Sequence, residues 1–296
     1  MNKYGSLLII IGGCMWGTMG IFARAFTAAG FSSSSVVTVR SIIAAIVIAI
    51  ILLFYNKKLF KIKFKDLWCF LGTGVIGIFM FNCAYFATIE ITSLSVATIL
   101  LYTSAIFVML ISVPCFKEKI TKKKLVCLVI AILGVVFVSG IVTGGAGALS
   151  AAGLLVGLAS GLGYGLYTIF SRFAMNRGYD SFTIMFYTYV CAVAAGLFFT
   201  DFEEVGQVIS SEGISIVVLL VVNVLVTIVI PYALYLTGLK SVENGKAAIL
   251  AFTEPITSII VGMVVFNEIP DVWGFLGIVL VLTSLTILNL KSKSEK

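Results

Sequence analysis

Residues 16–24 read WGTMGIFAR, and residues 164–172 read YGLYTIFSR. The second stretch begins 148 residues after the first, which is half of the 296-residue chain. Four of the nine positions are identical, including the closing arginine. Self-similarity at a fixed period is the signature of internal duplication, so this pair of stretches predicts that the chain consists of two related halves.

A second pair of segments supports the duplication. Residues 97–118 align with residues 247–268 at a shift of 150, and Tyr85 meets Tyr235 at the same shift. Apolar segments resemble one another by chance, but glycine, arginine and glutamate shared at fixed spacing do not follow from hydrophobicity. The identities in this block are Ala97, Ile99, Leu100, Thr103, Ile106, Phe116 and Glu118.

The composition places the chain in a membrane. Hydrophobic residues make up 60% of it and charged residues only 11%, against roughly 25% charged in a soluble domain. Runs of about 20 apolar residues, long enough to cross the hydrocarbon core as helices, recur along the whole length. We predict an all-α integral membrane protein with ten transmembrane helices near residues 5–26, 33–55, 67–89, 94–116, 123–143, 151–173, 181–200, 213–238, 245–267 and 272–291.

The basic residues predict the orientation, because Lys and Arg near span ends stay in the cytoplasm. With the N-terminus inside, 18 of the 20 basic residues lie at cytoplasmic ends, and only Arg24 and Arg40 do not. We therefore expect a multi-pass protein of the plasma membrane with both termini cytoplasmic. Because each half, residues 1–145 and residues 148–296, then holds five spans, the halves form an inverted repeat, an architecture associated with alternating access.

Several other classes of protein are disfavoured. The net charge of +7 reflects lysines at cytoplasmic loops, so it does not indicate nucleic-acid binding. The chain has no histidine and no CxxC pair, and no phosphate-binding loop of the GxxxxGK[ST] type appears. We expect no metal, no cofactor and no catalytic residues, and we regard the scattered cysteines as packing residues: Cys14, Cys69, Cys83, Cys115, Cys127 and Cys191.

An ordered set of short motifs resembles a known family. It comprises the WG of residues 16–17, Arg40 early in the second helix, and the FKE and FNE endings at residues 116–118 and 266–268. Together with ten helices in two repeats, these look like the EamA-like branch of the drug/metabolite transporter superfamily. The resemblance implies a transporter of small metabolites, commonly an exporter of amino acids or related compounds, with a central cavity between the halves. The family also includes uptake systems, so neither cargo nor direction carries over.

Glu254 is the most informative candidate residue. It lies near the middle of the predicted span 245–267, where a charged group costs about 3 kcal/mol or more. Its repeat counterpart is Ser104, so this acidic group exists in one half only. Three roles are open: a protonated structural group, an anchor for a cationic group of the substrate, or a proton-exchange site, which burial favours because it stabilises the uncharged form.

Arg40 is the second intramembrane charge. It lies seven positions beyond Ser33, about 10–12 Å into its helix at 1.5 Å per residue. The guanidinium could snorkel outward, pair with Glu254, or bind a substrate carboxylate. If both charges face one cavity, a zwitterion such as an amino acid would satisfy them.

Aromatic and amide side chains complete the candidate substrate-binding set. A single membrane aromatic more often packs or lies at the interface, but pairs on related repeats could wall a cavity that is otherwise apolar. The symmetric pairs are Trp16 with Tyr164, Tyr85 with Tyr235, and Tyr102 with Phe252, and the amides are Asn82 and Asn223.

Glycine ridges mark two helices that we expect to flank the cavity. Gly13 and Gly17 follow GxxxG spacing in the first span, and Gly157, Gly161 and Gly165 follow it in the sixth. Such ridges let helix backbones approach closely in lipid.

These features predict a secondary transporter that exports a small metabolite by alternating access, with protons as candidate coupling ions and a monomer or weak homodimer as the working unit. The alternative is a facilitative or uptake permease for a small cationic or zwitterionic solute. A membrane-embedded enzyme is disfavoured because the metal clusters and Ser–His or paired-aspartate groups it needs are missing. A channel is disfavoured because Glu254 has no repeat counterpart to form a ring of equivalent pore residues.

Overall fold

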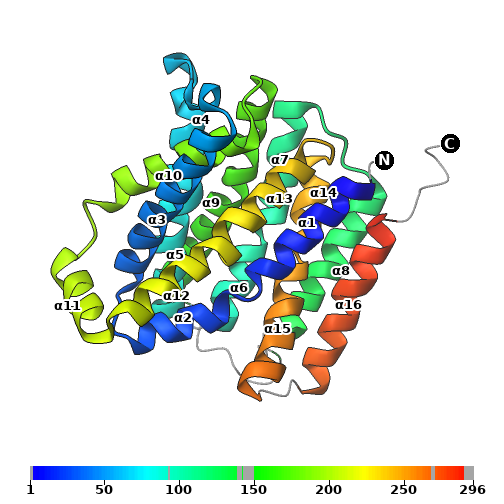
Figure 1. The fold of residues 1–296 in the computed structure, drawn as a ribbon. Coiled ribbons are helices and arrows are strands. Elements are labelled where there is room, and N and C mark those ends of the chain that lie inside the picture. The colour runs from blue at the N-terminus through cyan, green and yellow to red at the C-terminus, as the bar shows by residue number, and fades with distance from the viewer. Residues whose placement is uncertain (1–2, 93, 139–141, 143–149, 268–270, 290–296) are drawn as a thin grey trace.

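A computed structural model describes residues 3–92, 94–138, 142, 150–267 and 271–289. Within these ranges the chain is helical and has no strand, and the helices stand side by side as one bundle (Figure 1). Among the described residues, seven helical segments, some of them interrupted, are long and apolar enough to cross a membrane, so the ten predicted spans are met only in part. Two more, covering 181–196 and 272–288, are apolar but shorter. The boundary predicted between the halves, at 145–148, lies outside the described residues.

The first predicted span is broken in two. Helix α1 covers Lys3–Trp16 and helix α2 covers Met19–Ala28, and the chain turns between them at Gly17 and Thr18. The Thr18 hydroxyl donates to the carbonyl oxygen of Met15 at 2.7 Å, which closes the last turn of α1. A loop then leads to α3, Ser33–Tyr55, which has the predicted bounds.

The third and eighth predicted spans share an irregularity. The third consists of α4 (Leu67–Leu71), the π-helical stretch η3 (Gly72–Met80) and α5 (Phe81–Ile91). The eighth consists of α12 (Ile214–Val224), the π-helical stretch η5 (Leu225–Val229) and α13 (Ile230–Leu239). At the shift of 150, η5 falls inside the counterpart of η3. Each half therefore has a π-helical stretch at an equivalent position of its third predicted span.

The fourth and ninth predicted spans are each broken near their middle. Helices α6 (Leu94–Tyr102) and α7 (Ser104–Phe116) meet at Thr103, and α14 (Asn244–Leu250) and α15 (Thr253–Phe266) meet at residues 251–252. Both spans end in a left-handed residue, Lys117 with φ 57° and Asn267 with φ 55°. Among the described residues these are the only positive φ values outside glycine, and they too lie 150 positions apart.

The remaining helices match predicted spans less closely at their ends. The segment predicted as a span over 181–200 is helical only to Gly196, and a short helix follows at the end of the bundle (Figure 1). Asp201 begins that helix by accepting hydrogen bonds from the amides of Glu203 and Glu204, a standard N-cap. The bounds are α8 Lys122–Val138, α9 Ala151–Asn176, α10 Ser181–Gly196, α11 Phe202–Glu212 and α16 Val272–Asn289, with the 3₁₀ turns η1 Lys57–Phe60 and η2 Phe64–Asp66.

Helices of the first half pack against helices of the second half. Helix α1 packs on α13, α5 on α9, α3 on α10 and α8 on α16. Each pair joins one helix from each half, so the core of the bundle lies at the junction between them. One end of the bundle carries the lysines of residues 57–65 and 117–124, and we call it the basic end. The opposite end carries α11.

Candidate functional site

The glycine ridge of α1 crosses the broken helix of the other half. A Cβ at Gly13 would collide with the Thr253 hydroxyl, and a Cβ at Gly17 would lie 2.5 Å from the carbonyl oxygen of Glu254. The Thr253 hydroxyl also donates to the carbonyl oxygen of Ile10 at 3.2 Å. The end of α1 therefore lies backbone to backbone on the break between α14 and α15.

The glycine ridge of α9 makes the equivalent crossing. A Cβ at Gly161 would lie 2.7 Å from the Thr103 hydroxyl oxygen, and a Cβ at Gly165 would lie 3.1 Å from the carbonyl oxygen of Ser104. Gly161 and Thr103 correspond to Gly13 and Thr253 in the repeat alignment. The same contact is thus made twice, each time between the first helix of one half and the broken fourth helix of the other.

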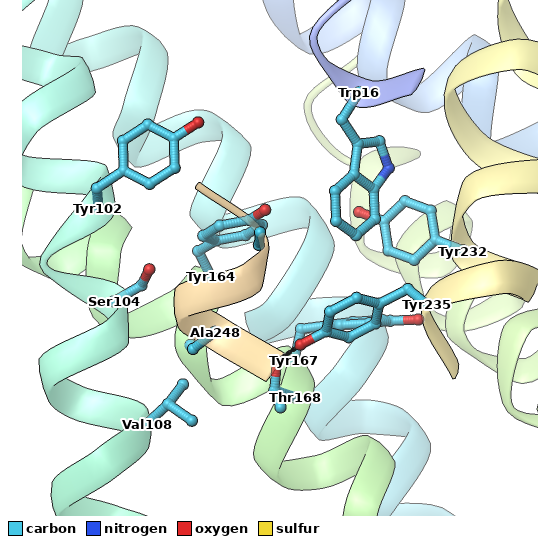
Figure 2. A pocket seen from close by; sticks show the side chains of 12 residues that line it. Trp16, Tyr102, Ser104, Val108, Tyr164, Tyr167, Thr168, Tyr232, Tyr235 and Ala248 are labelled. Carbon is cyan, nitrogen blue, oxygen red and sulfur yellow. Dashed lines mark hydrogen bonds between the residues drawn. The ribbon is translucent and has the colours of Figure 1, made fainter. Parts of the chain in front are cut away.

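A cavity lies between these two crossings. It is small, about 20 Å³, which is room for about one water molecule. Its wall comes from both halves, with Trp16 and Tyr232 on one side of the view and Tyr102 and Ser104 on the other (Figure 2). The lining residues are Trp16, Tyr102, Ser104, Val108, Tyr164, Gly165, Tyr167, Thr168, Tyr232, Tyr235, Ala248 and Ala251.

Glu254 lies in the first turn of α15 and does not itself line the cavity, but it contacts two tyrosines that do. The Tyr164 hydroxyl donates to its Oε2 at 3.2 Å, and the Tyr102 hydroxyl also interacts with the carboxyl group. Pro255 follows in the same turn, where a missing N–H costs least, so the proline is compatible with a helix that starts here. The carboxyl group is partly buried, so an intramembrane acid is held by two tyrosines that line the cavity.

Arg40 lies elsewhere and does not pair with Glu254. Its Nη2 donates to the Thr227 hydroxyl oxygen at 3.0 Å, in η5, and its buried Nε has no hydrogen-bond partner. The described residues provide it with no carboxylate. The hypothesis of an Arg40–Glu254 ion pair is therefore not met in this structure.

Tyr232 connects the two charges. It lies within electrostatic range of both Glu254 and Arg40. Its ring packs edge-on against Trp16 with the centroids 5.0 Å apart and against Tyr167 at the same distance. Tyr232 is thus a lining residue that packs on two other aromatic rings of the wall and has a charged group of each sign in its neighbourhood.

The structure brings some predicted residues to the cavity and leaves others behind. Trp16, Tyr102, Tyr164 and Tyr235 line it. Phe252 is fully buried and stacks behind Tyr102 with the ring centroids 4.9 Å apart. Three further predicted residues, Tyr85, Asn82 and Asn223, are absent from the lining. The Tyr85 hydroxyl lies 3.4 Å from that of Thr98, and the Asn82 amide nitrogen donates to the carbonyl oxygen of Ile78. The Asn223 amide nitrogen donates to the Thr227 hydroxyl oxygen at 3.2 Å.

Sequence reasoning missed four polar residues of the wall, Ser104, Tyr167, Thr168 and Tyr232. Tyr167 lies three positions after Tyr164, and Tyr232 lies three positions before Tyr235, which places each on the face of its predicted partner. Thr168 forms a 2.7 Å hydrogen bond with the Tyr235 hydroxyl. The helical spacing was the available signal for both tyrosines. No group of three His, Cys, Asp or Glu side chains suited to a metal ion occurs in the described part of the chain.

Comparison with known proteins agrees with this architecture. The profile of the EamA-like transporter family matches twice, over residues 3–140 and 151–290. The chain belongs to the EamA-like transporter family. As an EamA-like protein it has curated relatives of nearly the same length. An uncharacterized transporter of Archaeoglobus fulgidus is 25% identical over 290 residues, covering 96% of both chains.

Two further matches are informative. The uncharacterized inner membrane transporter YicL of Salmonella typhimurium is 23% identical, covering 99% of this chain and 97% of its own length. A solved crystal structure superposes over 100% of both chains with a TM-score of 0.77 at 16% sequence identity. At that identity the likeness shows the fold alone. The EamA-like chain is therefore a membrane transporter by family, a class that implies a small-molecule substrate.

Proposed function

We propose that this protein is a secondary transporter that exports a small metabolite, such as an amino acid or a related compound, by alternating access. In this proposal ten spans form two inverted five-helix repeats, residues 1–145 and 148–296, with both termini cytoplasmic. The recurrence of the glycine crossings, the π-helical stretches and the left-handed helix ends at shifts of 148 to 150 supports the repeat. The lysines gathered at the basic end support the orientation.

The observation that carries the proposal is the position of Glu254. It is an intramembrane carboxyl group at a helix break, it is held by Tyr164 from the cavity wall, and that wall is built by both halves. Breaks in membrane helices mark substrate and ion sites in secondary transporters. An acidic group beside aromatic faces is suited to a cationic group, through charge and through cation–π attraction.

The small volume of the cavity favours alternating access and disfavours a permanently open pore. A volume of about 20 Å³ is far below the roughly 300 Å³ at which ligand pockets begin. A metabolite therefore enters only if the helices around the wall separate. The glycine crossings provide the smooth contacts along which such helices can slide.

Arg40, within electrostatic range of the lining residue Tyr232, offers a second anchor. A buried guanidinium without a counterion is expensive, and its free Nε can donate to an anion. A zwitterion that reaches both groups would place its ammonium group near Glu254 and its carboxylate near Arg40. A facilitative or uptake permease for cationic or zwitterionic solutes is the second candidate, and the absence of a nucleotide-binding motif from the sequence fits both candidates equally.

The test is counterflow in proteoliposomes with a panel of amino acids, amines and neutral metabolites, with and without a pH gradient. The wild type is compared with Glu254→Gln, which keeps the shape of the side chain, and with Glu203→Gln, a control on exposed α11. We expect Glu254→Gln to lose at least tenfold in gradient-driven flux and Glu203→Gln to behave as wild type.

The pattern of loss assigns the role. If gradient-driven flux disappears and exchange remains, Glu254 is a proton site. If binding of cationic or zwitterionic solutes alone is lost, it is a substrate anchor. Unchanged flux in Glu254→Gln would show that the residue has a structural role only. Flux that does not saturate with substrate concentration would favour a channel.

A further inference from the structure

A network of polar side chains closes the bundle between the cavity and the basic end. Its centre is Asn244, the first residue of α14, whose side chain is fully buried. The Asn244 amide nitrogen Nδ2 donates to the Ser112 hydroxyl oxygen at 3.2 Å, and Arg172 Nε donates to Asn244 Oδ1 at 2.8 Å. The side chain thus joins α7 of the first half to α9 and α14 of the second.

A second layer holds the backbone of the same residue. Glu118 Oε1 accepts from the amide of Asn244 at 2.7 Å, and Oε2 accepts from the amide of Gly245 at 3.2 Å. Lys124, itself buried, forms ion pairs with Glu118 and with Glu243. Charge-assisted hydrogen bonds of this kind are about twice as strong as neutral ones, so the end of α7 is tied to the start of α14.

The network lies one helical turn from the cavity on every side. Ser112 follows the lining residue Val108 by four positions on α7. Arg172 follows the lining residue Thr168 by four positions on α9. Asn244 precedes the lining residue Ala248 by four positions on α14. Since residues four apart lie above one another on a helix, the three polar groups converge directly below the cavity floor.

The helices are also packed tightly at this level. A Cβ at Gly245 would lie 2.9 Å from the Met109 side chain, so α14 and α7 touch without a gap. Elsewhere at the basic end, the pair Lys240–Asp180 is exposed and joins segments away from the cavity.

We propose that Asn244 is the gate residue at the basic end, and that its bonds to Ser112, Arg172 and Glu118 break when the cavity opens on that side. The proposal rests on the transport function proposed above and assigns the moving contact. The bonds link the two halves, so their breakage separates α7 from α14 and α9. Because all partners are polar, water entering from the basic end can replace them, which keeps the cost of opening small.

The experiment measures access to the cavity and needs no substrate. In a chain whose six native cysteines are replaced, Ala248→Cys reports on the cavity wall, and a membrane-impermeant maleimide is applied to the basic face in oriented vesicles. We expect slow labelling in this background and at least tenfold faster labelling after Asn244→Ala. The control Lys240→Ala removes a polar contact at the same end and should leave the rate unchanged.

Further variants keep the test decisive. Glu118→Gln retains the side-chain shape, and its labelling rate should lie between those of the background and Asn244→Ala. This variant replaces Asn244→Ala in the test if Asn244→Ala does not fold in detergent. An unchanged rate in folded Asn244→Ala or Glu118→Gln would overturn the gate, as would equal acceleration by Lys240→Ala. If no solute is transported in proteoliposomes but the labelling rates follow the expected order, the proposed function fails and the gate stands as an opening contact.

Discussion

The two broken helices of the bundle have the same architecture and different chemistry. In the first half, α6 and α7 meet at Thr103 and the next residue is Ser104. In the second half, α14 and α15 meet just before Thr253 and the next residue is Glu254. Each break receives a glycine ridge from the other half. The two breaks therefore share a frame, and only one of them carries a charged side chain.

The comparison of the two breaks also shows that a proline is not needed to interrupt the helix. Pro255 removes a backbone donor near the second break, but its counterpart Ala105 does not, and the first helix is broken all the same. What the breaks share is the threonine, whose hydroxyl bonds a carbonyl oxygen three residues earlier in each case. The close glycine crossing is also common to both, so proline is not required for the break.

The largest effect is expected at Gly17, where an added side chain would meet the backbone beside Glu254. A Cβ at Gly17 would lie 2.5 Å from the carbonyl oxygen of Glu254, whereas one at Gly165 would lie 3.1 Å from that of Ser104. We expect Gly17→Leu to abolish counterflow and Gly165→Ala to retain a part of it, because overpacking costs about 1–3 kcal/mol and grows with the overlap. Membrane insertion should survive in both variants, as judged by expression and gel filtration. Equal counterflow in the two variants would show that the two crossings do not differ in this respect.

Tyr164 and Trp16 occupy equivalent positions in the two halves, and we expect their substitution to have smaller and unequal effects on transport. Tyr164→Phe removes the donor to Glu254, and hydrogen bonds to charged groups are worth about 1.5–3 kcal/mol. We expect the half-saturating substrate concentration to rise about tenfold or more. Trp16→Phe should raise it less, because the indole Nε1 has no hydrogen-bond partner. A larger effect of Trp16→Phe in the same counterflow assay would locate the anchor on the first half.

The smallest effect concerns the two left-handed helix ends. Lys117 and Asn267 both adopt positive φ, which is costly for lysine and milder for asparagine. Replacement by glycine should stabilise the protein by about 0.5–1 kcal/mol at Lys117 and by less at Asn267. Thermal unfolding in detergent measures both. A loss of stability in Lys117→Gly would show that its side chain does more than end the helix.

Parts of the site followed directly from the sequence. Glu254 was recognisable because a carboxylate in a long apolar run is rare, and Trp16, Tyr102, Tyr164 and Tyr235 because the repeat alignment paired them. Tyr85 was paired in the same way and Asn82 was chosen as an intramembrane amide, and yet both bond within the first half. In lipid, the outside of a helix is as apolar as the inside, so no polar face marks which residues turn inward.

The gate illustrates a different limit. Asn244 lies in a short loop-to-helix segment beside Glu243 and Lys246, and nothing local singles it out. Its importance comes from Ser112 and Arg172, which are 132 and 72 positions away. Such convergence depends on how helices from the two halves cross, which a linear pattern does not contain.

The sequence by itself determined that this chain lies in a membrane, that it is built from apolar helices, and that its two halves are related. Hydrophobic length, lysine placement and fixed-period identity are properties of residues in order. Only the tertiary structure decided that α1 breaks while its counterpart α9 runs on, that Arg40 bonds Thr227 in place of Glu254, and that six aromatic rings meet at one small cavity. The reason is physical, because these outcomes depend on backbone contacts between glycines and helix breaks that lie far apart in the chain.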